Sequence, residues 1–311
     1  MATRAGGVGS PQNRFLRPLI PILIVLAIGI VFLFIGSFIA AARSPDAAPL
    51  EVSRMIPFLV AGAVITYGIS LLAAREDLWR IGTREVVYMA IGAALYGVLS
   101  WATNVIVISP VSQVAVRPAI VIPIFFGIVF GPAVGFFSGF VGNILGDALT
   151  GWGVFPIWDI GNGLIGLVAG LIAVFRTSEQ NLNVLTGVIV AICVALAGLL
   201  LAYPETENML LGGTVAGYWW VPLLIAVLAI GARLLLRGRE ELAAAELWGA
   251  LAIIVGIGFA AIADIWWNGF SLITALLGEF VPAAGTNLIN SLILLPILLT
   301  AWKAAQAQTG R

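Results

Sequence analysis

The stretch VRPAIVIPIFFGIVFGPAVGFFSGFVGNILGDALTGWGVFPIWDIGNGLIGLVAG, residues 116–170, decides the fold of this chain. It is almost wholly apolar, yet it carries Asn143, Asp147, Asp159 and Asn162 close together. Ionisable side chains inside an apolar span are costly to bury and are therefore candidates for a functional site.

Glycines recur within this stretch at spacings of four, four, three and four residues, which places them on one face of a helix. Such a face lets a second helix approach closely in lipid, where packing drives helix association. Packing alone accounts for many stripes of this kind, but the neighbouring aspartates and asparagines favour a functional site beside this one. The glycines are Gly131, Gly135, Gly139, Gly142 and Gly146.

The composition indicates an all-α integral membrane protein with the lipid bilayer as its solvent. The chain has 311 residues, of which 61% are hydrophobic and 10% charged, and its mean hydropathy is +1.10. Backbone groups in lipid must bond to one another, and long apolar runs achieve this as helices. The sequence has no histidine and one cysteine, Cys193, so no metal site, disulfide or cofactor is expected. It has no Gly-Lys-Ser/Thr phosphate loop and no net charge, so neither ATP nor nucleic acid is an expected partner.

The apolar runs predict about ten transmembrane helices, with a loop over 268–282 in which a short interfacial helix is an alternative. An even number of spans places both termini on one side. With the termini in the cytoplasm, only Arg43, Arg54 and Arg117 of the Lys and Arg residues lie outside, which predicts this orientation in the plasma membrane. The predicted spans are Arg17–Ala42, Met55–Ala74, Glu85–Ile108, Pro118–Phe130, Ala133–Thr150, Pro156–Phe175, Val184–Tyr203, Thr214–Leu236, Leu247–Trp267 and Ala283–Trp302.

This orientation places the polar residues of the spans at a common depth. Asp147 follows Gly131 by 16 residues, which is about 24 Å along a helix and near the outer face. Five spans carry polar residues at this depth, so we expect a pocket open to the outside with aromatic walls. Its predicted substrate-binding residues are Asn104, Arg117, Asn143, Asp147, Trp158, Asp159, Asn162, Asp264, Trp267, Asn287 and Asn290.

Simpler roles exist for each of these residues. Tryptophans gather in the interfacial belt of many membrane proteins, and asparagines join helices by hydrogen bonds. Either Asp147 or Asp159 can simply form an ion pair with Arg117.

One combination of motifs resembles a known family. Phe130-Gly131-Pro132, Gly142-Asn143, Gly146-Asp147 and Gly161-Asn162-Gly163, with PAAGTNLINSLI near the end of the chain, are similar to the S components of energy-coupling-factor (ECF) vitamin transporters. The riboflavin-type group is the most similar. The resemblance covers 84–175 and 247–303, a little under half of the chain.

The resemblance implies capture of a water-soluble vitamin in an outward-facing pocket. It also implies a transmembrane scaffold subunit and two ATP-binding subunits as partners, with Ala90 and Ala94 at the scaffold contact. The family has a six-helix core, to which this chain adds two helices at the N-terminus and two by insertion. The expected segments are a disordered tail (1–16), the N-terminal helices (17–82), the first part of the core (83–176), the insertion (177–246), the second part of the core (247–303) and a tail (304–311).

The substrate and the class of function stay open at this point. The resemblance favours riboflavin, whereas three outer aspartates against one arginine suit a cation such as thiamine or its pyrimidine precursor. In another class of function, Asp147 and Asp159 are the acid and base of a membrane enzyme. A scaffold protein whose polar residues only join helices is the third alternative.

Overall fold

The computed structural model describes residues 11–47, 49–73, 78–104, 117–209 and 212–309. Within these ranges the chain contains ten α-helices and no β-strand, which confirms the prediction of an all-α membrane protein. Eight helices are long and apolar enough to cross a membrane, and two shorter apolar helices accompany them.

The helices follow the predicted spans closely. Short 3₁₀ turns and one π-helical turn, η5, connect or extend them. The elements used below are α1 (Pro11–Arg43), α2 (Val52–Ser70), α3 (Thr83–Asn104), η3 (Pro118–Ile120), α4 (Val121–Phe130), α5 (Pro132–Thr150), α6 (Pro156–Gly170), α7 (Glu179–Ala202), α8 (Trp220–Leu235), α9 (Glu240–Trp267), η5 (Thr274–Phe280) and α10 (Val281–Thr309).

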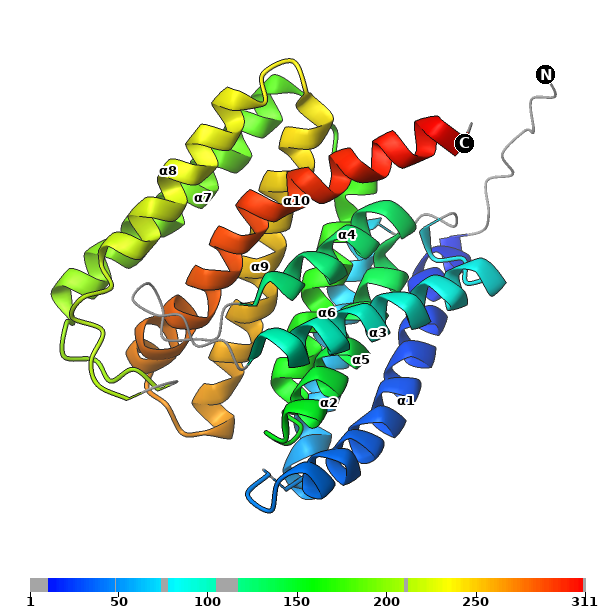
Figure 1. The fold of residues 1–311 in the computed structure, drawn as a ribbon, viewed down its shortest axis with the longest axis vertical. Helices are drawn as coiled ribbons and strands as arrows, with labels where there is room; N and C mark the ends of the chain where they lie inside the picture. Colours follow the sequence, from blue (N-terminus) through cyan, green and yellow to red (C-terminus); the bar gives the residue numbers. More distant parts are fainter. Residues whose placement is uncertain (1–10, 48, 74–77, 105–116, 210–211, 310–311) are drawn as a thin grey trace.

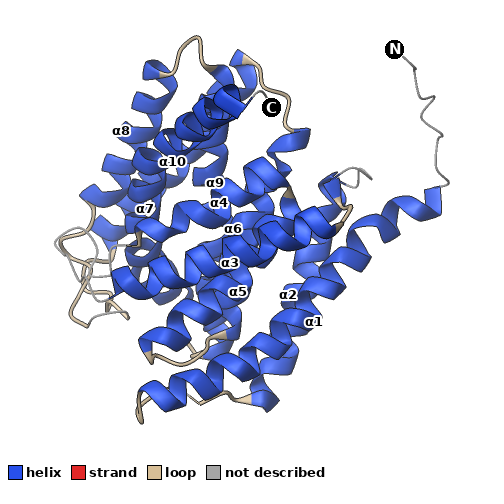
Figure 2. Ribbon diagram, turned by 45° about the vertical axis from the view of Figure 1, so that its right-hand side comes forward, coloured by secondary structure: helices blue, strands red, loops and turns tan. Residues whose placement is uncertain are grey.

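Helices α5 and α6 form the centre of the bundle and are buried along most of their length. Helix α3 packs on α5, α9 packs on α6, and α4 packs on both central helices. The N-terminal pair α1–α2 covers one flank, with α1 on α5 and α2 on α6. The pair α7–α8 lies on the opposite flank, beside α9 and α10 (Figures 1 and 2).

Two backbones meet without intervening side chains where α5 crosses α6. A Cβ atom on Gly135 would lie 2.2 Å from the carbonyl oxygen of Gly166, and one on Gly139 would lie 2.1 Å from that of Asn162. Only glycine permits this approach, and it brings the polar residues of the two helices together.

The predicted glycine stripe serves two neighbours rather than one. Gly135 and Gly139 face α6, whereas Gly142 and Gly146 face Tyr96 and Ser100 of α3. The stripe is wide enough for both because its spacings span an arc of the helix. Gly131 connects α4 to α5 with a φ of 104°, in the tight turn predicted there.

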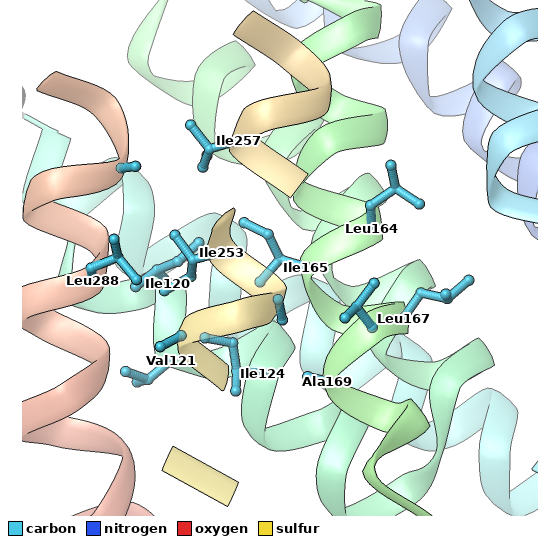
Figure 3. Close-up of a cluster of buried hydrophobic side chains, with 14 of the residues drawn as sticks. Ile120, Val121, Ile124, Leu164, Ile165, Leu167, Ala169, Ile253, Ile257 and Leu288 are labelled. Carbon is cyan, nitrogen blue, oxygen red and sulfur yellow. The ribbon is translucent and has the colours of Figure 1, made fainter. Parts of the chain in front are cut away.

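The apolar core beside this crossing is built from branched aliphatic side chains. Figure 3 shows Ile120, Ile124, Ile165, Ile253 and Leu288 gathered between η3–α4, α6, α9 and α10. This packing holds the middle of α6 and of α9 against η3 and α4.

The ends of the chain are more helical than predicted. Helix α1 begins at Pro11, inside the expected disordered tail 1–16, and α10 continues to Thr309 through the expected tail 304–311. A helix satisfies its own backbone bonds, so it can extend past the apolar span into the headgroup region. The expected loop 268–282 contains η5, which runs directly into α10.

Candidate substrate-binding site

Five polar side chains meet where α3, η3, α5 and α6 begin or end. Asn104 is the last residue of α3, Arg117 precedes η3, and Asp159 lies in the first turn of α6. Asn143 and Asp147 lie toward the end of α5. We call these five residues the polar cluster.

The polar cluster forms one continuous set of hydrogen bonds. Arg117 donates from Nη2 to Asp147 Oδ1 at 2.7 Å and from Nε to Asn104 Oδ1 at 3.0 Å. Asn143 donates from Nδ2 to Asp147 Oδ2 at 2.9 Å and to Asp159 Oδ1 at 2.8 Å. The Asn143 amide therefore joins the two carboxylates. Of these two carboxylates, the Arg117 guanidinium binds only that of Asp147.

The polar cluster carries one more negative than positive charge when its carboxylates are ionised. Asn143 and Asp159 have no exposed surface, and Asp147 is 4% exposed. Burying an ion pair costs hydration that the pair only partly recovers, and an unpaired buried charge costs far more. Arg117 compensates Asp147, so Asp159 is the group whose charge the cluster does not balance.

Two oxygens of the polar cluster have no hydrogen-bond donor among the residues that the structure describes. They are Asn143 Oδ1 and Asp159 Oδ2, and both are buried. A buried acceptor without a donor is costly, so these atoms mark the place where a ligand or water would donate. A ligand suited to this place offers N–H or O–H groups or a positive charge.

A second set of side chains, which we call the tryptophan branch, extends from α6 to α9. Trp158 donates from Nε1 to Asp264 Oδ2 at 2.9 Å, and Asn268 donates to Asp264 Oδ1 at 2.8 Å. Asn162 donates to the Trp158 carbonyl at 2.9 Å and accepts from the Tyr96 hydroxyl at 2.6 Å. Because Trp158 precedes Asp159 in α6, the branch adjoins the polar cluster.

Three predicted site residues lie outside both groups. The Trp267 ring packs edge-on against Phe58 at 4.9 Å, and its carbonyl accepts from Arg54. Asn287 donates to the Ala283 carbonyl of its own helix at 2.9 Å. Asn287 Oδ1 and Asn290 Nδ2 are buried atoms without partners. The hydrogen bonds described here do not bring α10 into the site.

The predicted scaffold contact is accessible. Ala90 and Ala94 are exposed on α3, on the side that does not face α5. The helices α1, α2, α7 and α8 pack elsewhere and leave this side of α3 open.

Sequence reasoning missed three polar residues near the site. Tyr96 binds Asn162, and Thr150 accepts from Asn104 Nδ2 at 3.0 Å. Glu279 is 4% exposed in η5, where a loop was expected. The signal for Glu279 was a single acidic residue in an otherwise apolar run, LLGEFVP.

Comparison with known proteins supports the resemblance. Residues 80–210 match the model of a family described as the ECF-type riboflavin transporter, S component. The resemblance predicted from the sequence is thus confirmed over these residues. The match ends within the expected insertion and does not extend to 247–303. The description names a transporter subunit rather than an enzyme.

Curated relatives share a shorter stretch. A UPF0397 protein of Vibrio atlanticus is 39% identical over 88 residues, which are 28% of this chain and 47% of the relative. A UPF0397 protein of Aliivibrio salmonicida is 36% identical over 91 residues, 29% of this chain and 49% of the relative. The chain thus spans about half the length of the curated relatives it matches. No solved structure is significantly similar to it.

Proposed function

We propose that this protein is the substrate-binding membrane subunit of an ECF-type transporter and captures a vitamin-sized solute at the polar cluster. The observation that carries the proposal is the convergence of Asn104, Arg117, Asn143, Asp147 and Asp159 in one buried network. Apolar membrane helices do not bury such a network without a use for it, because each polar group loses its hydration. The family match over 80–210, a range that contains all five residues, supports this role.

The transport cycle needs partner subunits. A transmembrane scaffold subunit would dock on the open side of α3, at Ala90 and Ala94, where small side chains allow close helix contact. Two ATP-binding subunits would supply the energy, in agreement with the lack of a Gly-Lys-Ser/Thr phosphate loop in this sequence.

Two solutes compete for the site. The family description favours riboflavin, whose ring would pack beside Trp158 and whose hydroxyls would donate to the acceptors of the polar cluster. The unbalanced Asp159, with the donor-free oxygens of Asn143 and Asp159, favours a cation such as thiamine or its pyrimidine precursor. The two alternatives differ in their need for the Asp159 charge.

The alternatives from other classes find less support. An acid–base pair needs two carboxyl groups facing a common substrate, whereas Asp147 is engaged by Arg117 and Asn143. A purely structural role leaves the oxygens of Asn143 and Asp159 without donors.

Binding to purified protein tests the proposal. The thermal midpoint is measured with a panel containing riboflavin, thiamine and its pyrimidine precursor, on the wild type and on Asp159→Asn. We expect one compound to raise the wild-type midpoint. Asp159→Asn should lower affinity about tenfold or more for a cation and little for riboflavin. No response to any compound at micromolar concentration would contradict the proposal.

A further inference from the structure

A pair of buried carboxyl groups lies at the end of the tryptophan branch, where η5 packs on α9. Asp264 has no exposed surface and Glu279 is 4% exposed. Their side chains lie in hydrogen-bonding contact. Two carboxyl groups in direct contact cannot both hold a negative charge in a low-dielectric site.

The hydrogen bonds around the pair do not balance its charge. Asp264 accepts from Trp158 and from Asn268, which are both neutral donors. Glu279 Oε2 is buried and has no donor within the described part of the chain. The contact between the two side chains is therefore one acceptor against another, and it is favourable only if a positive charge lies between them.

The charged groups on the surrounding elements do not supply that charge. On α2, Arg54 binds Glu51 and the Trp267 carbonyl. The connection between α7 and α8 contributes Glu207, and α6 contributes Asp159, which are both acidic. The ion pairs of Arg117 and Arg233 also go to other carboxylates. No ion pair among the described residues compensates Asp264 or Glu279.

The backbone holds Glu279 in this unfavourable position. Residues Thr274–Phe280 form a π-helical turn, a rare conformation that often marks functional sites. The next residue back, Gly278, is locked by the α7–α8 connection, since Met209 N–H donates to its carbonyl at 2.9 Å. The fold thus fixes the side chain against Asp264 instead of releasing it.

We propose that Asp264 and Glu279 bind one small monovalent cation. This cation is either a proton or Na⁺, each of which carries a single positive charge. A proton taken from water outside converts the contact into an acid–carboxylate hydrogen bond, whereas Na⁺ is held by both carboxylates. The bound cation also fixes Trp158 through Asp264, next to Asp159 of the polar cluster. This cation site adjoins the proposed solute site through Trp158, but it does not depend on the identity of the solute.

Thermal unfolding of the purified full-length protein in detergent tests the cation site. The midpoint is measured from about pH 6 to about pH 8, in choline chloride and in NaCl at equal ionic strength. A folded state that holds a proton absent from the unfolded chain loses stability as pH rises. We expect the wild-type midpoint to fall by about 3 °C per pH unit in choline chloride. If Na⁺ is the bound cation, NaCl raises the midpoint instead, most strongly at high pH.

Three variants isolate the pair from other titrating groups. Glu279→Gln and Asp264→Asn each replace one carboxylate by an amide that donates to the remaining one, so each should abolish the contribution of the pair to the response and leave that of other buried carboxyl groups such as Asp159. Glu205→Gln, on the exposed α7–α8 connection, is the matched control and should respond as the wild type does.

Each outcome decides the proposal. A response to pH alone identifies the proton and a response to NaCl identifies Na⁺, provided that either amide variant reduces it. A wild-type midpoint that changes with neither pH nor NaCl overturns the proposal. A wild-type midpoint whose response equals that of Glu279→Gln and Asp264→Asn overturns it as well. If neither variant folds, the wild-type protein is tested for a response to NaCl and for the infrared absorption of a protonated carboxyl group. Its absence, together with no response to NaCl, overturns the proposal as well.

Discussion

Helix pairs α5–α6 and α7–α8 both contain glycines, but they use them in opposite ways. Between α5 and α6, a Cβ atom on Gly166 would lie 2.0 Å from the carbonyl oxygen of Gly135. On α7, a Cβ atom on Gly187 or Gly198 would meet nothing within 4 Å. A glycine in a membrane helix therefore does not by itself indicate close packing. The central pair is interlocked backbone to backbone, whereas the flanking pair presents its glycines to open space.

The two pairs differ in the same way in their charges. Arg117 and Asp147 lie 2.7 Å apart with side chains 14% and 6% exposed. Arg233 of α8 is 8% exposed, but its partner Glu179 lies at 3.5 Å and is 78% exposed. The central ion pair is closed off from water, and the flanking one is open to it. Substitutions of matched residues in the two regions should therefore have very different effects.

Arg117→Gln should have the largest effect, because it leaves Asp147 buried without its cation. Breaking a buried pair costs about 3–5 kcal/mol, so we expect a loss of unfolding free energy of that size in reversible detergent denaturation. The double variant Arg117→Gln/Asp147→Asn removes both charges and should recover most of the loss. A single variant within about 1 kcal/mol of the wild type would show that water or a cation reaches Asp147.

Gly135→Ala should have the next largest effect. The added methyl group meets the Gly166 carbonyl and the Gly127 Cα, and backbone atoms cannot rotate aside. Overpacking costs about 1–3 kcal/mol, so we expect a loss at the upper end of that range in the same denaturation measurement. Solute affinity should fall as well, because the shift separates Asn143 from Asp159. Unchanged stability would mean that α5 and α6 move apart freely.

The sequence predicted the central pair better than the flank or the far end of the site. The spans, the turn at Gly131 and the positions of Asn143, Asp147 and Asp159 at the adjoining ends of α5 and α6 follow from hydropathy and helix geometry. The contact of Arg117 with Asp147 was one of the alternatives left open, because sequence spacing does not choose a partner across a loop.

Other features depend on packing that a one-dimensional pattern does not contain. The split of the glycine stripe between α6 and α3 requires the positions of both neighbours. Glu279 was missed because the segment 268–282 was expected to be a loop or a short interfacial helix, whereas it contains a π-helical turn that buries the side chain. Asn287 has the predicted depth and a suitable residue type, but it donates to the Ala283 carbonyl within α10. Depth along a span does not give the direction in which a side chain points.

Gly187→Ala is the matched control for Gly135→Ala and should have the opposite sign. Alanine is favoured over glycine in a helix by about 1 kcal/mol, and Gly187 has no neighbour that a methyl group would meet. We expect a small gain in unfolding free energy, at most about 1 kcal/mol, with unchanged solute affinity. A loss of more than about 1 kcal/mol would show that α7 is packed against a partner as closely as α5 is.

Glu179→Gln should have the smallest effect. It tests whether an exposed ion pair contributes less to the unfolding free energy than the buried pair of Arg117 and Asp147 does. Arg233 keeps two other partners when the Glu179 charge is removed: its Nε donates to Asn183 at 3.0 Å, and Glu240 lies at 3.6 Å. Because Glu179 is largely exposed, water and salt screen its attraction to Arg233, and such pairs contribute about 0–1 kcal/mol. We expect a loss below about 0.5 kcal/mol that disappears at high salt, whereas the loss in Arg117→Gln should persist there. A loss as large as that of Arg117→Gln would mean that α7 and α8 depend on Arg233 as the central pair depends on Arg117, and that exposure does not separate the two regions.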